Sequence, residues 1–283
     1  MKGVGMERIQ AFVTQLCQSL LSILKIVLQS RRVKRVKPSD KAMARGIVVL
    51  GNGPSLNNTV DSAADFLAMH DLLAVNFAAC TPLFKQLRPA YYLLADGHFF
   101  RALDQPNVKQ LWSSIAHVEW QMTLFVPARA ILPQLPVNPL LTVARYNATP
   151  VEGFPAFEDW CYSRGLGMPR PRNVLIPSIM EAIGMGYKKV YIAGADHSWT
   201  RTLSVDDDNN VVSVQPHFYK EDDREVQRIN TEYMHHPLHT IMYSFYVAFK
   251  SYFTIARYAR SRGTEVVNIT PGSFIDAFPR MKV

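Results

Sequence analysis

A glycine turn directly after an apolar run is the stretch of this sequence best suited to chemistry. Ile47–Leu50 is short, apolar and β-branched, which is typical of a buried parallel strand. The residues that follow it are Gly51, Asn52, Gly53, Pro54 and Ser55. Glycine lets a backbone turn tightly and approach a ligand, proline fixes φ, and serine can cap a following helix. Amides aimed out of such a turn suit a phosphate, so we predict a phosphate-binding turn, with an ordinary strand-to-helix turn as the alternative.

The spacing of this turn argues against one familiar chemistry. It matches neither the dinucleotide-binding pattern GxGxxG nor the P-loop pattern GxxxxGK[ST], and no lysine follows Gly53. P-loop ATPase chemistry is therefore not expected.

Polar residues also follow three other apolar runs, at 72–75, 91–95 and 189–193. In open α/β sheets, ligands bind at the carboxyl ends of the strands. Asn and Asp also end strands as ordinary turn residues, but four of them on one edge favour a ligand site. The four residues are Asn52, Asn76, Asp96 and Asp196, the last after Gly194.

The elements that must position these residues alternate along the chain. Further strands are expected at 124–126 and 265–269, and helices at 173–185 and 238–262. Such alternation predicts an α/β fold with a mostly parallel sheet flanked by helices.

Composition limits the class of protein. The 283 residues suffice for one sizeable core. Three scattered cysteines, Cys17, Cys80 and Cys161, favour a reducing compartment and argue against a disulfide framework or a zinc site. The net charge of +8 lies in residues 1–45, which carry ten Lys or Arg and two Asp or Glu, whereas the remainder carries 21 of each sign. The charge therefore says nothing about a basic groove in the folded body.

The N-terminal segment predicts an amphipathic helix followed by a basic linker. Apolar residues recur at helical spacing from Ile9 to Leu28, with Gln and Ser largely opposite. Gln15, Gln18 and Lys25 make it a poor transmembrane span, and it lacks the small-residue cleavage site of a secretory signal. The basic cluster is Arg31, Arg32, Lys34, Arg35 and Lys37. We expect attachment to an anionic membrane surface, with docking on the protein's own domain as the alternative.

A nucleic-acid partner is not expected, because no aromatic residues interleave with the basic run. Pro38, Ser39 and Asp40 mark the end of the segment. Two regions are thus predicted: an anchor at 1–45 and a folded domain at 46–283.

Several motifs together resemble one superfamily over about residues 47–279. They are Gly51–Leu56, Asn76, the block GYKKVYIAGAD at 186–196, and Val267–Ser273. They resemble the bacterial CMP-sialic-acid sialyltransferases of Campylobacter type, the motility-associated flagellin glycosylation factors and the MptE-like hydroxymethylpterin diphosphokinases. The resemblance implies a Rossmann-like domain that binds a nucleotide, with a lid at about 197–236.

The resemblance also implies roles for individual residues. Asn52 would contact the phosphate or sugar of the nucleotide, and Asn76 its base or ribose. Gly194 and Asp196 would complete the nucleotide site, and Asp96 stands where the sialyltransferases carry Asn. The implied function is a glycosyltransferase that uses a nucleotide-activated sugar, such as a CMP-nonulosonate, for surface-glycan synthesis. Its partners would be the donor and a glycan or lipid-linked acceptor, at the inner face of the bacterial cytoplasmic membrane.

Sugar transfer needs a base that removes the acceptor's hydroxyl proton, and histidine suits this near neutral pH. In the sialyltransferases a His beyond the Gly-x-Asp strand does this within an H-x-x-x-H segment. Here His217 supplies the first position and Glu221 stands at the second. The rivals are His236 and His239 at the start of the expected helix, where the dipole lowers a histidine pKa.

Two other functions remain open from the sequence. An MptE-like pyrophosphokinase would need ATP and Mg²⁺, and a non-catalytic nucleotide-binding protein at the membrane would need neither. No metal site is expected otherwise: the acidic run 206–210 lies between hairpin-like flanks and favours a solvated turn. The histidines around 235–239 lack an accompanying HExxH pattern.

Overall fold

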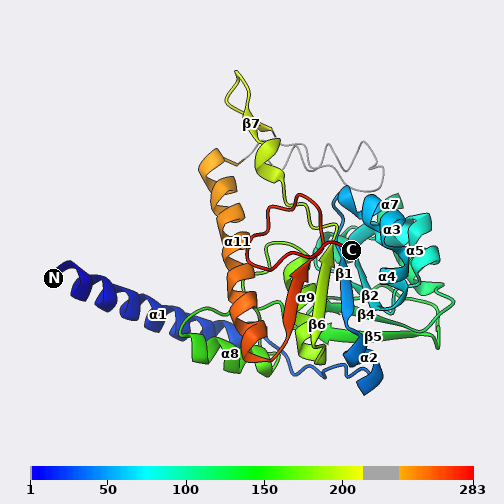
Figure 1. The fold of residues 1–283 in the computed structure, drawn as a ribbon, viewed down its shortest axis with the longest axis horizontal. Helices are drawn as coiled ribbons and strands as arrows, with labels where there is room; N and C mark the ends of the chain where they lie inside the picture. Colours follow the sequence, from blue (N-terminus) through cyan, green and yellow to red (C-terminus); the bar gives the residue numbers. More distant parts are fainter. Residues whose placement is uncertain (1, 213–235) are drawn as a thin grey trace.

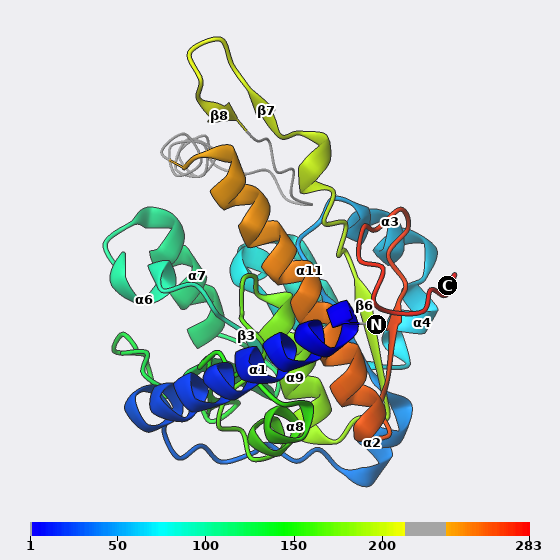
Figure 2. The same ribbon diagram turned by 90° about the vertical axis from the view of Figure 1, so that its left-hand side faces the viewer.

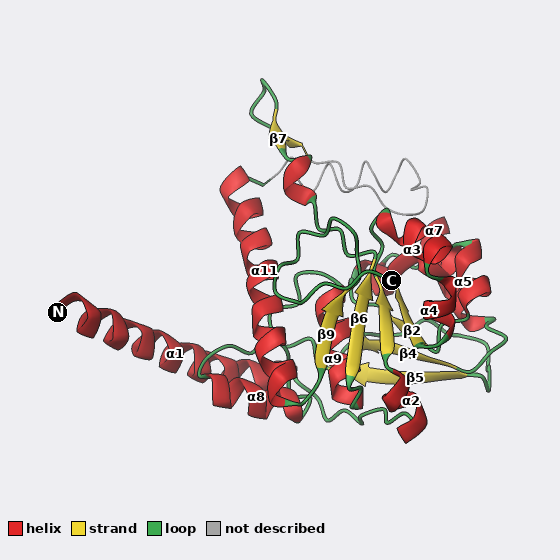
Figure 3. Cartoon of the chain, viewed as in Figure 1, coloured by secondary structure: helices red, strands yellow, loops and turns green. Residues whose placement is uncertain are grey.

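A seven-stranded parallel sheet forms the centre of the computed structural model, which describes residues 2–212 and 236–283 (Figures 1 and 3). The strands run in the order β5-β4-β3-β2-β1-β6-β9, and every neighbouring pair is parallel. They are β1 Ile47–Leu50, β2 Asp71–Val75, β3 Tyr91–Leu93, β4 Met122–Pro127, β5 Leu141–Tyr146, β6 Lys189–Ala193 and β9 Glu265–Asn268. Because the chain runs outward from β1 to β5 and then returns for β6, the strand order reverses between β1 and β6.

Helices cover both faces of this sheet (Figures 1 and 2). Alternate strand residues face opposite layers: Ile47 and Val49 pack with α9 and α11, whereas Val48 and Leu50 pack with α3. The helices are α1 Lys2–Gln29, α2 Asp40–Arg45, α3 Ser55–Ser62, α4 Ala64–Ala68, α5 Pro82–Leu87, α6 His98–Arg101, α7 Pro106–Ala116, α8 Pro155–Ser163, α9 Leu175–Met185 and α11 Leu238–Ser261. Short 3₁₀ turns occur at η1 Asn76–Cys80 and η2 Trp199–Arg201, and a hairpin pairs β7 Ser204–Val205 with β8 Val211–Val212.

The predicted α/β, Rossmann-like class is confirmed, and one strand was missed. Strand β5 pairs with β4 at the edge of the sheet. It lies in the Pro-rich stretch after residue 127, for which the sequence predicts irregular structure. Its Thr142, Val143 and Arg145 are exposed. A strand buried on one side only lacks the continuous apolar run that marks the central strands.

Helix α1 packs on the body with polar residues and exposes apolar ones. The Ser22 hydroxyl donates to the Glu152 carbonyl oxygen (2.8 Å) and accepts from the Glu152 N–H (2.9 Å), and Ser19 Oγ accepts from the Phe154 N–H (3.1 Å). The N-terminal half of the helix projects from the body (Figure 1). Its exposed large side chains include Met6, Ile9, Phe12, Val13, Leu16, Leu20, Leu24, Val27 and Leu28. This is the reverse of the arrangement in a soluble amphipathic helix, which buries its apolar face.

The length and hydropathy of α1 differ from the sequence-based expectation of a poor membrane span. Residues Met6–Gln29 form a helix long and apolar enough to cross a membrane, by length and composition alone. The serine contacts show that the second half of the helix is attached to the domain through hydrogen bonds.

The linker after α1 is attached to the body as well. Ser30 Oγ donates to the Leu166 carbonyl oxygen (2.6 Å), and the Arg31 backbone N–H donates to Asn147 Oδ1 (2.8 Å). Arg35 donates to the Tyr162 carbonyl oxygen. Arg35 therefore points into the domain, unlike Arg31, Arg32, Lys34 and Lys37 of the basic cluster, which are exposed.

Arg35 lies near a carboxyl group with an unusual pKa, and this makes a prediction about stability. Burial raises the pKa of Glu181 on α9 from 4.5 to about 7, and the positive charge of Arg35 opposes the rise. A raised folded-state pKa stabilises the fold below the unfolded value, and this stabilisation is lost as the pH rises through the folded value. We compare the free energies of unfolding of Glu181→Gln and wild type in urea between about pH 4.5 and pH 7. The difference between the two should shift in favour of the variant as the pH rises, because the variant carries no carboxylate at this position. A constant difference between the two proteins at every pH would contradict this account.

Candidate functional site

The turns after β1 and β6 are joined at the point where the strand order reverses. The Gly51 N–H donates to the Ala193 carbonyl oxygen (2.8 Å), and the Gly53 N–H donates to the Gly194 carbonyl oxygen (2.8 Å). Ser55 Oγ donates to Asp196 Oδ2 (2.7 Å). Sheets of this kind bind ligands at such a reversal, so the joined turns form the floor of the candidate site.

The joined turns explain why glycine stands at 51 and 53. A Cβ on Gly53 would lie 1.8 Å from Asp196 Oδ2, and one on Gly51 would lie 2.5 Å from the Gly194 carbonyl oxygen. The two glycine amides are already used within the protein. The amides left without a hydrogen-bond partner among the described residues of this turn are those of Asn52 and Ser55. A phosphate would have to bind through these two rather than through the glycines.

Three buried polar atoms at the same edge of the sheet have no hydrogen-bond partner among the described residues. They are Asn52 Oδ1 after β1, Asn76 Oδ1 after β2 and His98 Nε2 after β3. An unsatisfied buried polar group costs about 1–3 kcal/mol, and native proteins contain few of them. Three of them at one edge make the carboxyl ends of β1, β2 and β3 the candidate site.

The sheet register and one ring contact relate the three turns that carry these groups. Val49 of β1 is paired with Leu73 of β2, so Asn52 and Asn76, each three residues further on, lie at the same level. The Phe77 and Phe99 rings, one residue after Asn76 and one after His98, pack edge to face with centroids 5.1 Å apart. The turns after β2 and β3 are thus held against each other.

Asn76 is held in an uncommon backbone conformation. Its φ of 51° lies in the left-handed region, which Asn tolerates better than most residues. The Tyr92 hydroxyl of β3 donates to the Asn76 carbonyl oxygen and accepts from the Ala79 N–H (2.8 Å). These bonds fix the η1 turn through its backbone, and none of them involves the Asn76 side-chain oxygen.

Asp96 and Asp196, which the sequence places at the site, both make structural contacts. Asp96 is exposed, and its Oδ1 accepts from the His98 N–H (2.8 Å), which shapes the turn into α6. Asp196 is partly exposed and holds Ser55. His98 is the residue that sequence reasoning missed, although it follows the same strand end two residues after Asp96.

His197, next to Asp196, forms a hydrogen-bonded chain with Tyr252 of α11 and with Asn173, which precedes α9. Its Nε2 lies 2.6 Å from the Tyr252 hydroxyl, which in turn donates to Asn173 Oδ1 (3.0 Å). Burial lowers the pKa of His197 to about 3, so the ring is neutral at physiological pH. A base works best with a pKa near the operating pH, so His197 is better suited to joining β6 to the helices than to proton transfer.

The structure describes two of the three histidines that were predicted as bases. His217 lies outside the described residues. His236 and His239 are exposed at the start of α11, whose first turn begins at Leu238. Both remain predictions.

The described part of the predicted lid packs on the first half of α11. Val211 of β8 is buried with Ile241 and Phe245, and Trp199 and Leu203 pack against this cluster. The hairpin turn is exposed, and Asp206 Oδ1 accepts from the Asn210 N–H (2.7 Å), as in a solvated turn. Within residues 2–212 and 236–283, no three His, Cys, Asp or Glu side chains come together as they would around a metal ion.

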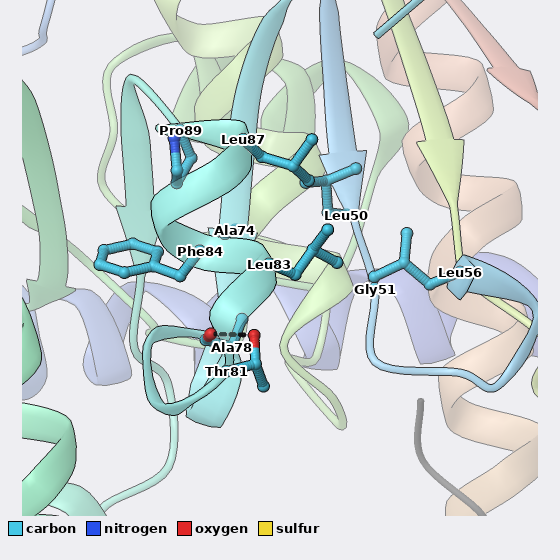
Figure 4. Close-up of a pocket in the computed structure, with 10 residues that line it drawn as sticks. All are labelled: Leu50, Gly51, Leu56, Ala74, Ala78, Thr81, Leu83, Phe84, Leu87 and Pro89. Carbon is cyan, nitrogen blue, oxygen red and sulfur yellow. Dashed lines mark hydrogen bonds between the residues drawn. The ribbon is translucent and has the colours of Figure 1, made fainter. Parts of the chain in front are cut away.

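An apolar hollow lies beside the glycine turn, between β1, β2, α3 and α5 (Figure 4). Its volume is about 280 Å³ when the adjoining open solvent is included. Its lining hydroxyl, on Thr81, already donates to the Ala78 carbonyl oxygen (2.8 Å). The lining residues are Leu50, Gly51, Leu56, Ala74, Ala78, Thr81, Leu83, Phe84, Leu87 and Pro89. The hollow is apolar, so the polar groups of the candidate site lie at the strand ends and not in this hollow.

Comparison with known proteins adds a likeness of fold. No protein-family model and no curated protein matches the chain. Among solved structures, the chain is similar to the MAf glycosyltransferase from Magnetospirillum magneticum AMB-1, with a TM-score of 0.50 and 11% sequence identity. The likeness covers 95% of this chain but 38% of the other, so this chain spans well under half of that protein. At this identity the comparison supports a glycosyltransferase-like fold.

Proposed function

We propose that this protein is a glycosyltransferase that takes its sugar from a nucleotide-activated donor and builds a surface glycan. The observation that carries the proposal is a set of three buried polar atoms, on Asn52, Asn76 and His98, that lie after β1, β2 and β3 and have no hydrogen-bond partner in the described part of the chain. The fold likeness to a glycosyltransferase supports it, although a fold alone does not specify an activity.

The proposed chemistry asks little of the protein beyond binding and proton transfer. Because the donor is already activated, the enzyme must orient donor and acceptor, remove the acceptor's hydroxyl proton and stabilise the departing phosphate. Asn52 and Asn76 would hold the donor, and the free amides of Asn52 and Ser55 would face its phosphate. A CMP-nonulosonate is the donor we propose first, on the resemblance of the glycine turn and of residues 186–196 to the sialyltransferases.

A donor panel tests this proposal. Wild-type protein is incubated with CMP-, UDP- and GDP-sugars, and separately with ATP and Mg²⁺, and sugar release and transfer are followed. We expect one nucleotide-sugar to be consumed, and Asn52→Ala and Asn76→Ala to lose that turnover. Transfer of diphosphate from ATP would instead support the pyrophosphokinase, and nucleotide binding without turnover of any donor would support a non-catalytic role.

We further propose that α1 attaches the protein to an anionic membrane surface. The helix docks on the domain through Ser19, Ser22 and the partly buried Ile26, and it leaves most of its other large apolar side chains exposed, as in helices that lie in the membrane interface. The exposed basic residues Arg31, Arg32, Lys34 and Lys37 directly follow the helix. Each basic residue near an anionic surface contributes about 1 kcal/mol of attraction.

Substitutions on the exposed face of α1 test the attachment. We expect the triple variant Leu20→Glu, Leu24→Glu, Val27→Glu to lose binding to vesicles that contain anionic lipid, because three charges replace side chains that would enter the acyl region. Reversing Arg31, Arg32 and Lys34 should weaken binding in a salt-dependent way, and Arg35 is left unchanged because it contacts the domain. The measurement is vesicle co-sedimentation, with turnover of a soluble acceptor as the control. Undiminished sedimentation of the triple variant would refute the attachment.

A further inference from the structure

We propose that His98 binds the nucleoside part of the donor directly, through its buried Nε2. The proposal rests on the proposed function and adds to it a residue and the part of the ligand that the residue contacts. His98 Nε2 is buried and has no hydrogen-bond partner among the described residues, and the same is true of the side-chain oxygens of Asn52 and Asn76. Its backbone is fixed by the bond from its N–H to Asp96 Oδ1.

The polarity of this group of atoms selects the part of the ligand. The buried atoms of Asn52 and Asn76 are carbonyl oxygens, which only accept hydrogen bonds. An ionised phosphate offers acceptors alone and cannot satisfy them. A base amine or a ribose hydroxyl supplies the N–H or O–H that they need, and a neutral imidazole Nε2 can donate to or accept from the same groups. The three atoms therefore suit a nucleoside, and the phosphate lies beyond them.

The other predicted residue at this strand end, Asp96, has different surroundings. Asp96 is exposed, and its Oδ1 already accepts from the His98 N–H. The contact between the Phe77 and Phe99 rings joins the turn that carries Asn76 to the turn that carries His98. Asp96 thus shapes the turn that carries His98, and His98 meets the ligand.

Calorimetric titration of the intact protein tests the assignment. The probes are cytidine, uridine, guanosine and adenosine, their 2′-deoxy forms, their 5′-monophosphates and inorganic phosphate. For the nucleoside that binds best, we expect His98→Phe to weaken binding about 10-fold and His98→Gln, which keeps a polar group near the Nε2 position, to stay within about 3-fold of wild type. Binding of inorganic phosphate should not change. If the 2′-deoxy form binds wild type and His98→Phe equally, His98 contacts the 2′-hydroxyl; if it retains the 10-fold loss, His98 contacts another group of the nucleoside.

A second measurement separates binding from a structural role. Phenylalanine replaces an unpaired buried ring nitrogen by carbon, so the free His98→Phe protein should melt no lower than wild type. The controls are Asp96→Asn, which keeps the acceptor for the His98 N–H, and His117→Phe, at a histidine that is exposed on the surface. A lower melting temperature with unchanged nucleoside affinity would overturn the assignment, as would wild type that binds no nucleoside. Either result leaves the proposed function to the donor panel, which measures sugar transfer and does not depend on His98.

Discussion

Replacement of Gly53 by valine is expected to unfold the junction between β1 and β6 and to lower the free energy of unfolding by about 3 kcal/mol or more. The Cβ alone would lie 1.8 Å from Asp196 Oδ2 and 2.7 Å from the Gly194 carbonyl oxygen. Neither atom can retreat freely, because Asp196 is bonded to Ser55 and Gly194 is bonded to the Gly53 N–H. Urea denaturation measures the loss, and donor affinity should vanish with it.

A matched glycine in the same part of the molecule provides the control. A Cβ on Gly97 would meet the end of the flexible Arg101 side chain, which can move away. Gly97→Ala should therefore cost less than about 1 kcal/mol, whereas Gly53→Ala already costs about 1–3 kcal/mol. Equal stability of the Gly53 variants and wild type would show that the two turns are not joined as described.

The His217→Ala variant is expected to lower kcat by about 10²- to 10⁴-fold, the usual contribution of a positioned base, with little change in donor affinity. The expectation comes from the resemblance to the sialyltransferases, since His217 lies outside the described residues. Single-turnover kinetics with the donor found by the panel measures the chemical step separately from donor binding.

The rival histidines make clean comparisons for this experiment. His236 and His239 are exposed at the start of α11, so alanine at either position should leave the fold intact. Full turnover by His217→Ala, together with loss of turnover in one of these variants, would assign the base to the start of α11.

The central strands could be predicted from the sequence because burial on both faces demands a continuous apolar run. Ile47–Leu50 and Lys189–Ala193 are strands β1 and β6 of the structure. The edge strand β5 was not predicted, because its solvent-exposed residues interrupt the apolar run. An apolar run indicates that a strand is buried, but it does not indicate which strands lie beside it. The reversal of strand order between β1 and β6 is therefore seen only in the structure.

The candidate site was predictable in part, for a similar reason. Polar residues at strand ends pointed to Asn52 and Asn76, whose side-chain oxygens have no hydrogen-bond partner within residues 2–212 and 236–283. The same rule pointed to Asp96, yet that residue is used to shape its turn. The sequence also predicted that the glycines of the turn after β1 let the backbone approach a ligand. In the structure, Gly53 leaves room for the Asp196 side chain. The two residues are far apart in the sequence, so no local sequence pattern predicts this contact.

For the N-terminal helix too, the sequence predicted the element but not its contacts. Its spacing correctly predicted an amphipathic helix, but periodicity does not say which face a helix buries. The hydrogen bonds of Ser19 and Ser22 show that the polar face is docked, and most of the large apolar side chains of the helix are exposed.

Hydrogen exchange of backbone amides, with and without a saturating nucleotide-sugar from the panel, tests most directly whether the donor binds at the carboxyl edge of β1, β2 and β3. Because the amides of Asn52 and Ser55 have no partner among the described residues, donor binding should slow exchange in the peptide that contains them. Peptides that contain Asn76 and His98 should be protected as well. Unchanged exchange in all three peptides, with donor binding shown by calorimetry under the same conditions, would place the donor elsewhere and contradict the account.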